Sequence, residues 1–160
     1  MSRNVHSLLV AIALCLNSGQ SSQSAESREG QLPEEIRQAI KETTQSCPSK
    51  ITFAKGFIER VNVLGNGKID FLLNYFAVEC GYDSPHFFCG SGGCTTQVFV
   101  HLDDGSYLKV LDDTVRNVTF TLEYGMPAMT IELHGSSCDK APESCSETLY
   151  WNGMEFTPAH

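Results

Sequence analysis

The sequence is poor in basic residues and has no long hydrophobic run. It contains 11 Lys and Arg against 19 Asp and Glu, a formal net charge of −8 in 160 residues. Because phosphate binding needs a basic surface, this balance argues against nucleic acid as the main partner. The longest apolar run, Leu8–Leu16, has about half of the roughly 20 residues that a membrane-spanning helix needs. We therefore expect no membrane span.

The motifs of familiar enzymes are also missing. The sequence has no G-x-S-x-G elbow and no H-E-x-x-H, and no pair of carboxylates has a spacing that singles it out. Its 13 Gly and 6 Pro show no triplet period, which excludes collagen, and 41% hydrophobic residues are too many for a disordered tail. The composition fits one compact globular domain. We predict no catalytic residues, no cofactor and no bound metal.

The first 24 residues have the pattern of a secretory signal peptide. Arg3 precedes the apolar run Leu8–Leu16, and a small, polar stretch follows up to Ser24. Cleavage near Ser24 would leave 10 basic against 19 acidic residues, a formal charge of −9. Lipidation of Cys15 is the alternative, which the bulky Leu14 before it disfavours. We therefore predict a periplasmic or secreted protein.

Six cysteines remain after this cleavage, an even number for an oxidising compartment. Six cysteines allow fifteen pairings, and the sequence does not select among them. Short loops close at the lowest entropic cost, so partners are expected to be close in sequence. The expected disulfides are Cys89–Cys94, Cys138–Cys145 and, by elimination, Cys47–Cys80.

A zinc site is the alternative use of these cysteines. It would combine Cys89 and Cys94 with the histidines at positions 86, 101 and 134. Zinc clusters normally use two tight cysteine pairs, and Cys138 and Cys145 are too widely spaced for the second. Disulfides are therefore the favoured interpretation.

A polar lead and one short helix are predicted over residues 25–46, and one β-rich domain over residues 47–160. Pro33 suits a first helical turn, and Ile36, Ala39 and Ile40 recur at helical spacing, which predicts an amphipathic helix over 33–43. Seven or eight short strands separated by turns follow. This pattern indicates a mainly β fold with one N-terminal helix, an antiparallel meander that forms a small barrel or a sandwich and is stabilised by disulfides.

Two Asn-Gly steps predict tight hairpin turns, at Asn66-Gly67 and at Asn152-Gly153, because both central positions of the preferred two-residue turn need positive φ. The first step lies in the segment Asn62–Asp70, which has the outline of a secreted calcium loop. Leu64 replaces an oxygen ligand there and only Asp70 keeps a charge. Too little anionic oxygen remains to offset the dehydration of Ca²⁺, so we interpret this segment as a hairpin.

Two further segments stand out as candidate sites. The glycines of Phe88–Cys94 leave backbone N–H groups unobstructed, which suits either a recognition loop or a tight turn that requires glycine. His134 lies at the end of a predicted strand, where it is either a capping or surface residue or the base of a small hydrolase with Ser91 or Ser136 as nucleophile.

Four segments together resemble a family of small exported bacterial proteins with no assigned activity. They are Gly65–Asp70, Phe88–Cys94, Leu133–Cys138 and Trp151–Gly153. The resemblance covers about residues 45–156 and implies a periplasmic β-rich domain. In general character the chain is also similar to periplasmic lysozyme inhibitors, whose Ser-Gly-x-x-Tyr loop enters the enzyme cleft. Asp104–Tyr107 is the comparable segment, although its serine follows the glycine.

These observations predict a binding or inhibitory module for a basic protein, such as a cell-wall hydrolase of lysozyme type. Its acidic charge suits a cationic partner because complementary fields raise association rates. The alternatives are a structural envelope protein without enzymatic activity and a small periplasmic hydrolase that uses His134. The candidate binding residues are Asp104, Ser106, Tyr107, Ser91, Gly92 and His134.

Overall fold

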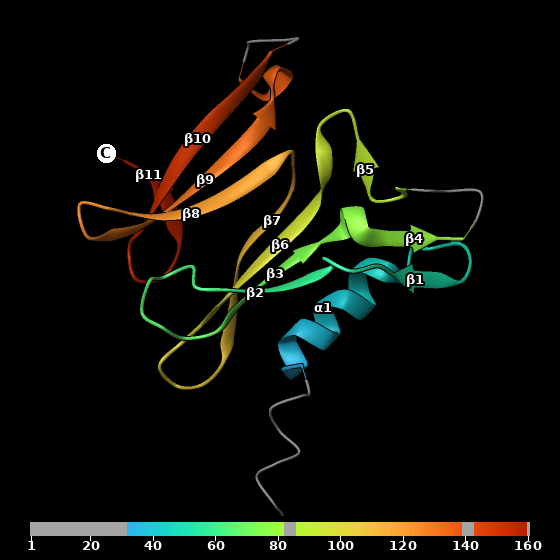
Figure 1. The fold of residues 1–160 in the computed structure, drawn as a ribbon, viewed down its shortest axis with the longest axis horizontal. Coiled ribbons are helices and arrows are strands. Elements are labelled where there is room, and N and C mark those ends of the chain that lie inside the picture. Colours follow the sequence, from blue (N-terminus) through green and yellow to red (C-terminus); the bar gives the residue numbers. More distant parts are fainter. Residues whose placement is uncertain (1–31, 82–85, 139–142, 160) are drawn as a thin grey trace, which may run out of the picture. The chain divides into compact units, whose positions relative to one another are not determined.

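A computed structural model describes residues 32–81, 86–138 and 143–159. In these residues one helix precedes two antiparallel β-sheets and a small strand pair (Figure 1). The predicted fold class, mainly β with one N-terminal helix, is confirmed. The predicted signal peptide and the start of the polar lead lie outside the described residues.

The helix and strands of the described residues are short, and two 3-10 turns interrupt them. They are α1 (Glu34–Thr44), β1 (Ile51–Phe53), β2 (Ile58–Val61), β3 (Asp70–Asn74), η2 (Tyr75–Ala77), β4 (Val78–Cys80), β5 (Cys89–Gly90), β6 (Gly93–His101), β7 (Tyr107–Val115), β8 (Asn117–Glu123), β9 (Met126–His134), η3 (Gly135–Ser137), β10 (Ser144–Trp151) and β11 (Phe156–Pro158). Eleven strands in the described chain exceed the seven or eight expected, because several have only two to four residues.

Strand β6 is the centre of a five-stranded sheet. It pairs with β7 over its whole length on one side and with β3 and β5 in turn on the other, and β2 extends the sheet beyond β3. A four-stranded sheet has the order β11-β10-β9-β8, and β1 pairs with β4. The two larger sheets share one apolar core, so the fold is a sandwich and not a closed barrel.

Both faces of the five-stranded sheet are buried. Val98 and Val100 of β6 point into the core between the sheets, where Met129 and Ile131 of β9 meet them. Phe99, one residue out of step, packs in a second core with Ile36 of helix α1. This alternation follows from the two-residue period of a strand. Three layers result: helix, five-stranded sheet and four-stranded sheet.

The three predicted disulfides are confirmed. Cys47–Cys80 links the chain after α1 to β4, Cys89–Cys94 joins β5 directly to β6, and Cys138–Cys145 joins the end of η3 to β10. A relaxed disulfide typically contributes about 2–4 kcal/mol, largely by restricting the unfolded chain. Three such bonds fit a protein that folds in an oxidising compartment.

Both Asn-Gly steps lie in hairpins, as predicted, but the predicted two-residue turns are wrong. Val61 pairs with Asp70, so Asn66-Gly67 lies within the longer loop 62–69, and Trp151 pairs with Phe156 across the loop 152–155. Side chains shape both loops, because a carboxylate or amide oxygen in each accepts backbone N–H groups. The two-residue turn with positive φ at both positions is Tyr124-Gly125, with φ of 54° and 80°.

Candidate functional site

Four connections meet at one end of the sandwich, which we call the loop end. They are loop 62–69, loop 102–106, the turn at residues 124–125 and loop 152–155 (Figure 1). A cavity of about 290 Å³ lies between them. Its lining residues come from three of these connections and from the strand ends beside them: Leu64, Asn66, His101, Leu102, Asp103, Pro127, Trp151 and Gly153.

Asp70 organises the loop end from inside. Its carboxylate is fully buried and accepts hydrogen bonds from the backbone N–H of Val63, at 2.7 Å, and of His101, at 2.8 Å. One side chain therefore ties loop 62–69 to the end of β6. The sequence interpretation noted Asp70 only as a remnant calcium ligand and missed this positioning role.

The other oxygens of the calcium-like segment also face the backbone. The side-chain oxygen of Asn62 accepts the N–H of Gly67 at 3.3 Å, and that of Asn66 accepts the N–H of Lys68 at 3.0 Å. The sequence resembles a calcium loop because both loop types place oxygens at short spacing; here these oxygens shape the turn. Within the described ranges, no group of three or more His, Cys, Asp or Glu residues could hold a metal ion.

Lys68 makes a second connection between loops. Its ammonium group donates to the carbonyl of Leu102 at 3.2 Å and to the carboxylate of Asp103 at 2.6 Å. The hydrogen bond and the charge of Lys68 lower the pKa of the Asp103 carboxyl. Asp103 is fully exposed, so this ion pair orients the loop more than it stabilises the fold.

The β6–β7 hairpin contains three of the predicted binding residues, and all three make contacts that shape the loop end. The carboxylate of Asp104 accepts the backbone N–H of Ser106 at 3.0 Å and its hydroxyl at 2.6 Å, and these hydrogen bonds lower the pKa of Asp104. Tyr107 donates its hydroxyl to the carbonyl of Ile69 at 3.1 Å and stacks on His101. Ser106 and Tyr107 thus brace the loop, and Asp104 remains at its exposed surface.

Four large apolar side chains are exposed at the loop end. Tyr124 in the two-residue turn is 98% exposed, Met154 76%, Ile69 at the end of loop 62–69 49%, and Met126 47%. Tyr150 of β10 pairs with Ala128 of β9, which places loop 152–155 beside the start of β9. None of these exposed side chains was predicted from the sequence. The signal available for Tyr124 was its position next to Gly125, a residue type typical of turns.

Carboxylates share the loop end with these apolar side chains. Asp103, Asp104, Glu123 and Glu155 lie in the loops or at the adjoining strand end, and Lys68 is the cation among them. Glu123 accepts the hydroxyl of Tyr150 at 2.7 Å, a hydrogen bond that raises the pKa of Tyr150. The loop end is therefore acidic and also exposes apolar side chains.

The remaining predicted binding residues lie at the opposite end of the sandwich. Ser91 and Gly92 are in the β5–β6 turn, next to Cys94 at the start of β6, whereas His101 at its other end belongs to the loop end. A Cβ atom on Gly93 would lie 2.1 Å from the carbonyl oxygen of Val115. This close approach requires glycine and favours the tight-turn interpretation of the segment. The structure thus divides the predicted binding residues between two ends.

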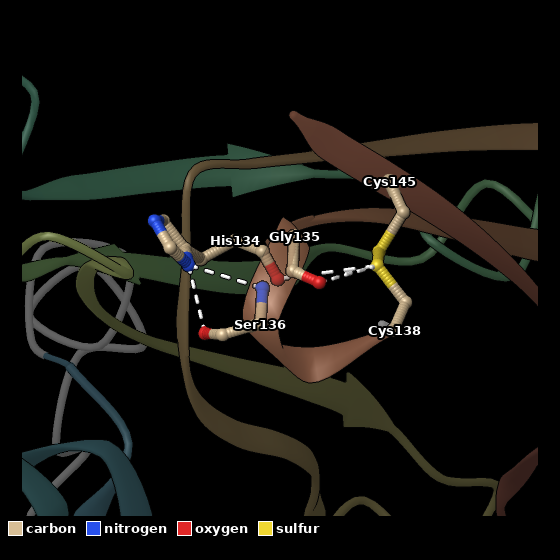
Figure 2. The surroundings of a disulfide bond; sticks show 5 residues. All are labelled: His134, Gly135, Ser136, Cys138 and Cys145. Atoms are coloured by element: carbon tan, nitrogen blue, oxygen red, sulfur yellow. Dashed lines mark hydrogen bonds between the residues drawn. A yellow bond between two sulfur atoms is a disulfide. The ribbon is translucent and has the colours of Figure 1, made fainter. Parts of the chain in front are cut away.

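His134 caps a 3-10 turn beside the Cys138–Cys145 disulfide (Figure 2). Its Nδ1 accepts the backbone N–H of Ser136 at 3.2 Å and lies 2.8 Å from the Ser136 hydroxyl. Because Nδ1 already accepts an N–H, it is unprotonated and the hydroxyl donates to it. In the described parts of the chain, no hydrogen bond joins His134 to a carboxylate that would orient it as a base.

A larger cavity of about 430 Å³ opens between the sheets away from the loop end. Leu72 of β3 and Val118 of β8 are among its apolar walls, and Glu59 and Arg116 are its charged residues. Arg116 donates to the carbonyl of Ser91 at 3.4 Å, which connects this cavity to the β5–β6 turn. The cavity shows that the two sheets separate along the side where β8 forms an edge.

The fold and the loop end define a disulfide-bonded β-sandwich with an acidic, partly apolar surface built from loops. Comparisons of the chain with protein-family models, with curated proteins and with solved structures give no match. Within the described ranges, no helix is long and apolar enough to cross a membrane.

Proposed function

We propose that this chain is an exported binding module that docks on a basic protein through its loop end. The observation that carries the proposal is the exposure of Tyr124 and Met154 at the loop end, where Asp104 and Glu155 are also exposed. Exposed aromatic and methionine side chains are enriched in protein interfaces, and surrounding charges of one sign select the charge of the partner.

The construction of the loop end supports this role. Docking costs less free energy when a surface is ordered before the partner arrives. Asp70 and Lys68 each join loop 62–69 to the β6–β7 hairpin, and Asn152 accepts the N–H groups of Met154 and Glu155, both at 2.9 Å. The apolar side chains are thus carried on loops that are held by internal hydrogen bonds.

The partner class follows from charge and compartment. The predicted signal peptide and the three disulfides support an envelope or extracellular site, where the module without residues 1–24 would have a formal charge of −9. A basic cell-wall hydrolase of lysozyme type is the proposed partner, and inhibition of that hydrolase in the periplasm is the proposed function. Ser106 and Tyr107 are partly buried, so we assign contact to the exposed side chains of Asp104, Tyr124, Met154 and Glu155.

A lysis assay tests the proposal. The purified protein should slow lysis of a cell-wall suspension by a basic lysozyme at near-equimolar amounts, and less so at high salt, because exposed charges are screened. Changing Asp104 and Glu155 together to Lys should weaken inhibition at least tenfold. Changing Tyr124 and Met154 together to Ala should weaken it with little change in the salt dependence.

The matched control is Glu79→Lys, an exposed carboxylate on β4 away from the loop end. It removes the same charge as one loop-end substitution and should leave inhibition within a factor of two. Lysis that proceeds unchanged across basic lysozymes of several classes would exclude the hydrolase. Equal losses for Glu79→Lys and Glu155→Lys would show that total charge, and not the loop end, attracts the partner.

A further inference from the structure

The outer strand of the four-stranded sheet has an open edge. Strand β8 is seven residues long and, among the described strands, pairs only with β9. Natural proteins usually protect such edges with Lys, Pro, a bulge or a very short strand. The sequence of β8, N-V-T-F-T-L-E, contains no Lys or Pro, and its register with β9 is regular throughout. The opposite edge, β11, has three residues and contains Pro158.

The hairpin geometry identifies which backbone groups of β8 face this edge. Glu123 and Met126 flank the two-residue turn, and in such hairpins the flanking pair exchanges both hydrogen bonds. Backbone groups of alternate residues back to Asn117 therefore point toward β9. Those of Val118, Phe120 and Leu122 point away from the sheet, where they are available to another strand.

The side chains of β8 are incompletely covered on their inner face. Val118 and Phe120 pack against the core but are only partly buried, and Leu122 is 57% exposed although it lies against Gly65. The two-residue period of a strand places these three side chains on the core side of β8. Their burial is incomplete because β8 lies beside the open side of the sandwich. An additional strand at this edge would cover Val118, Phe120 and Leu122.

We propose that this additional strand is β8 of a second copy, paired antiparallel about a two-fold axis at Phe120. In this register Phe120 exchanges two backbone hydrogen bonds with its own counterpart. The cross-strand pairs are Val118 with Leu122, Thr119 with Thr121, and Asn117 with Glu123. Apolar residues then face apolar residues, and each Glu123 faces an amide instead of a like charge.

The same sequence disfavours other two-fold registers. An axis at Val118 would run the partner strand past the start of β8, and an axis at Leu122 would run it into the turn at Tyr124, so each pairs fewer residues. An axis at Phe120 uses all seven residues of β8. The result is a closed, isologous dimer with one sheet continuing through both copies.

Charge reversal across the pair tests the register. Thr119 and Thr121 are exposed on the outer face, so changes there should leave the monomer folded, as circular dichroism would verify. The double change Thr119→Lys with Thr121→Lys puts like charges opposite each other twice. The double change Thr119→Lys with Thr121→Glu puts opposite charges there and is the matched control.

Sedimentation equilibrium supplies the measurement. We expect twice the chain mass for the wild-type protein and for the Lys/Glu variant, and the single chain mass for the Lys/Lys variant at the same concentration. A wild-type protein that stays monomeric up to millimolar concentration would refute the dimer. A Lys/Lys variant that remains dimeric, or a Lys/Glu variant that becomes monomeric, would refute this register.

Discussion

At the scale of single residues, the buried carboxylate of Asp70 shapes a loop whose sequence has only the outline of a calcium loop. Asp70 is completely inaccessible, and its described hydrogen bonds all come from backbone N–H groups. Ca²⁺ loops and carboxylate-braced loops use the same residue types, because both need oxygen atoms at short spacing. Whether such an oxygen binds a metal ion or a backbone N–H depends on which strands lie next to it. For Asp70 that strand is β6, which is distant in sequence and supplies the N–H of His101.

Replacing Asp70 by Asn should therefore destabilise the fold although the two side chains have the same shape. An amide presents one oxygen and one N–H₂ group, so a buried backbone N–H of Val63 or His101 would face a donor. Leaving such a group unpaired costs about 1–3 kcal/mol, which urea unfolding would measure. Asp113→Asn, at an exposed site on β7, should change stability by less than about 0.5 kcal/mol. Equal stability of the two variants would contradict the positioning role of Asp70.

Tyr75 is the second residue whose environment has a measurable consequence. Its buried hydroxyl donates to Gln97 at 3.1 Å, and Gln97 in turn donates to Thr43 and Asp112. Burial raises the pKa of Tyr75 to about 12. This network joins α1 to the five-stranded sheet with polar groups inside an otherwise apolar interface.

Alkaline pH should therefore weaken the fold through Tyr75. The folded-state pKa of about 12 lies above the unfolded value of 10.0, so the protonated form is favoured by folding. Its stabilising effect is complete below pH 10 and is lost as the pH rises through 12. Urea unfolding at stepped pH should show this loss, and Tyr75→Phe should reduce the slope between pH 10 and 12. An unchanged slope in Tyr75→Phe would mean that other groups cause the loss.

At the scale of elements, local pattern predicted the strands better than the turns. The turn-separated strand pattern predicted a mainly β fold, and helix α1 ends within one residue of its predicted end. The turns differed because Asn152 and Asp70 accept backbone N–H groups, which lengthens the connections. Positive φ at Tyr124 is unusual for a residue other than glycine. Residue preferences for turns therefore did not predict the two-residue turn at Tyr124-Gly125.

The candidate site was also only partly accessible from the sequence. The resemblance of Asp104–Tyr107 to an inhibitor loop made Asp104 a candidate, which remains a prediction, and the disulfide partners were predicted because loop closure favours near neighbours. The assembly of Tyr124, Met154 and Glu155 was not found, because they lie on different connections. Only the order β11-β10-β9-β8 and the packing of the two sheets bring these connections to one end.

At the scale of the whole molecule, the two proposed surfaces are separate and compatible. The proposed dimer uses the edge of β8, whereas the proposed contact with a basic partner uses loops at the end of the sandwich. Antiparallel pairing of β8 reverses the direction of one copy relative to the other. The turn at Tyr124 of each copy then lies beside the start of β8 in its counterpart, so the two loop ends face opposite ways.

This geometry predicts the stoichiometry of the complex. A wild-type dimer should bind two molecules of a basic lysozyme independently, because the contact residues of the two copies are not shared. The Thr119→Lys, Thr121→Lys monomer should bind one molecule with the same affinity per site. Calorimetry gives the ratio and affinity, and sedimentation gives the mass of the complex. A dimer that binds a single partner would show that the loop ends face each other, which antiparallel pairing about Phe120 forbids. A monomeric variant that loses binding would instead place part of the partner's site across the β8 edge.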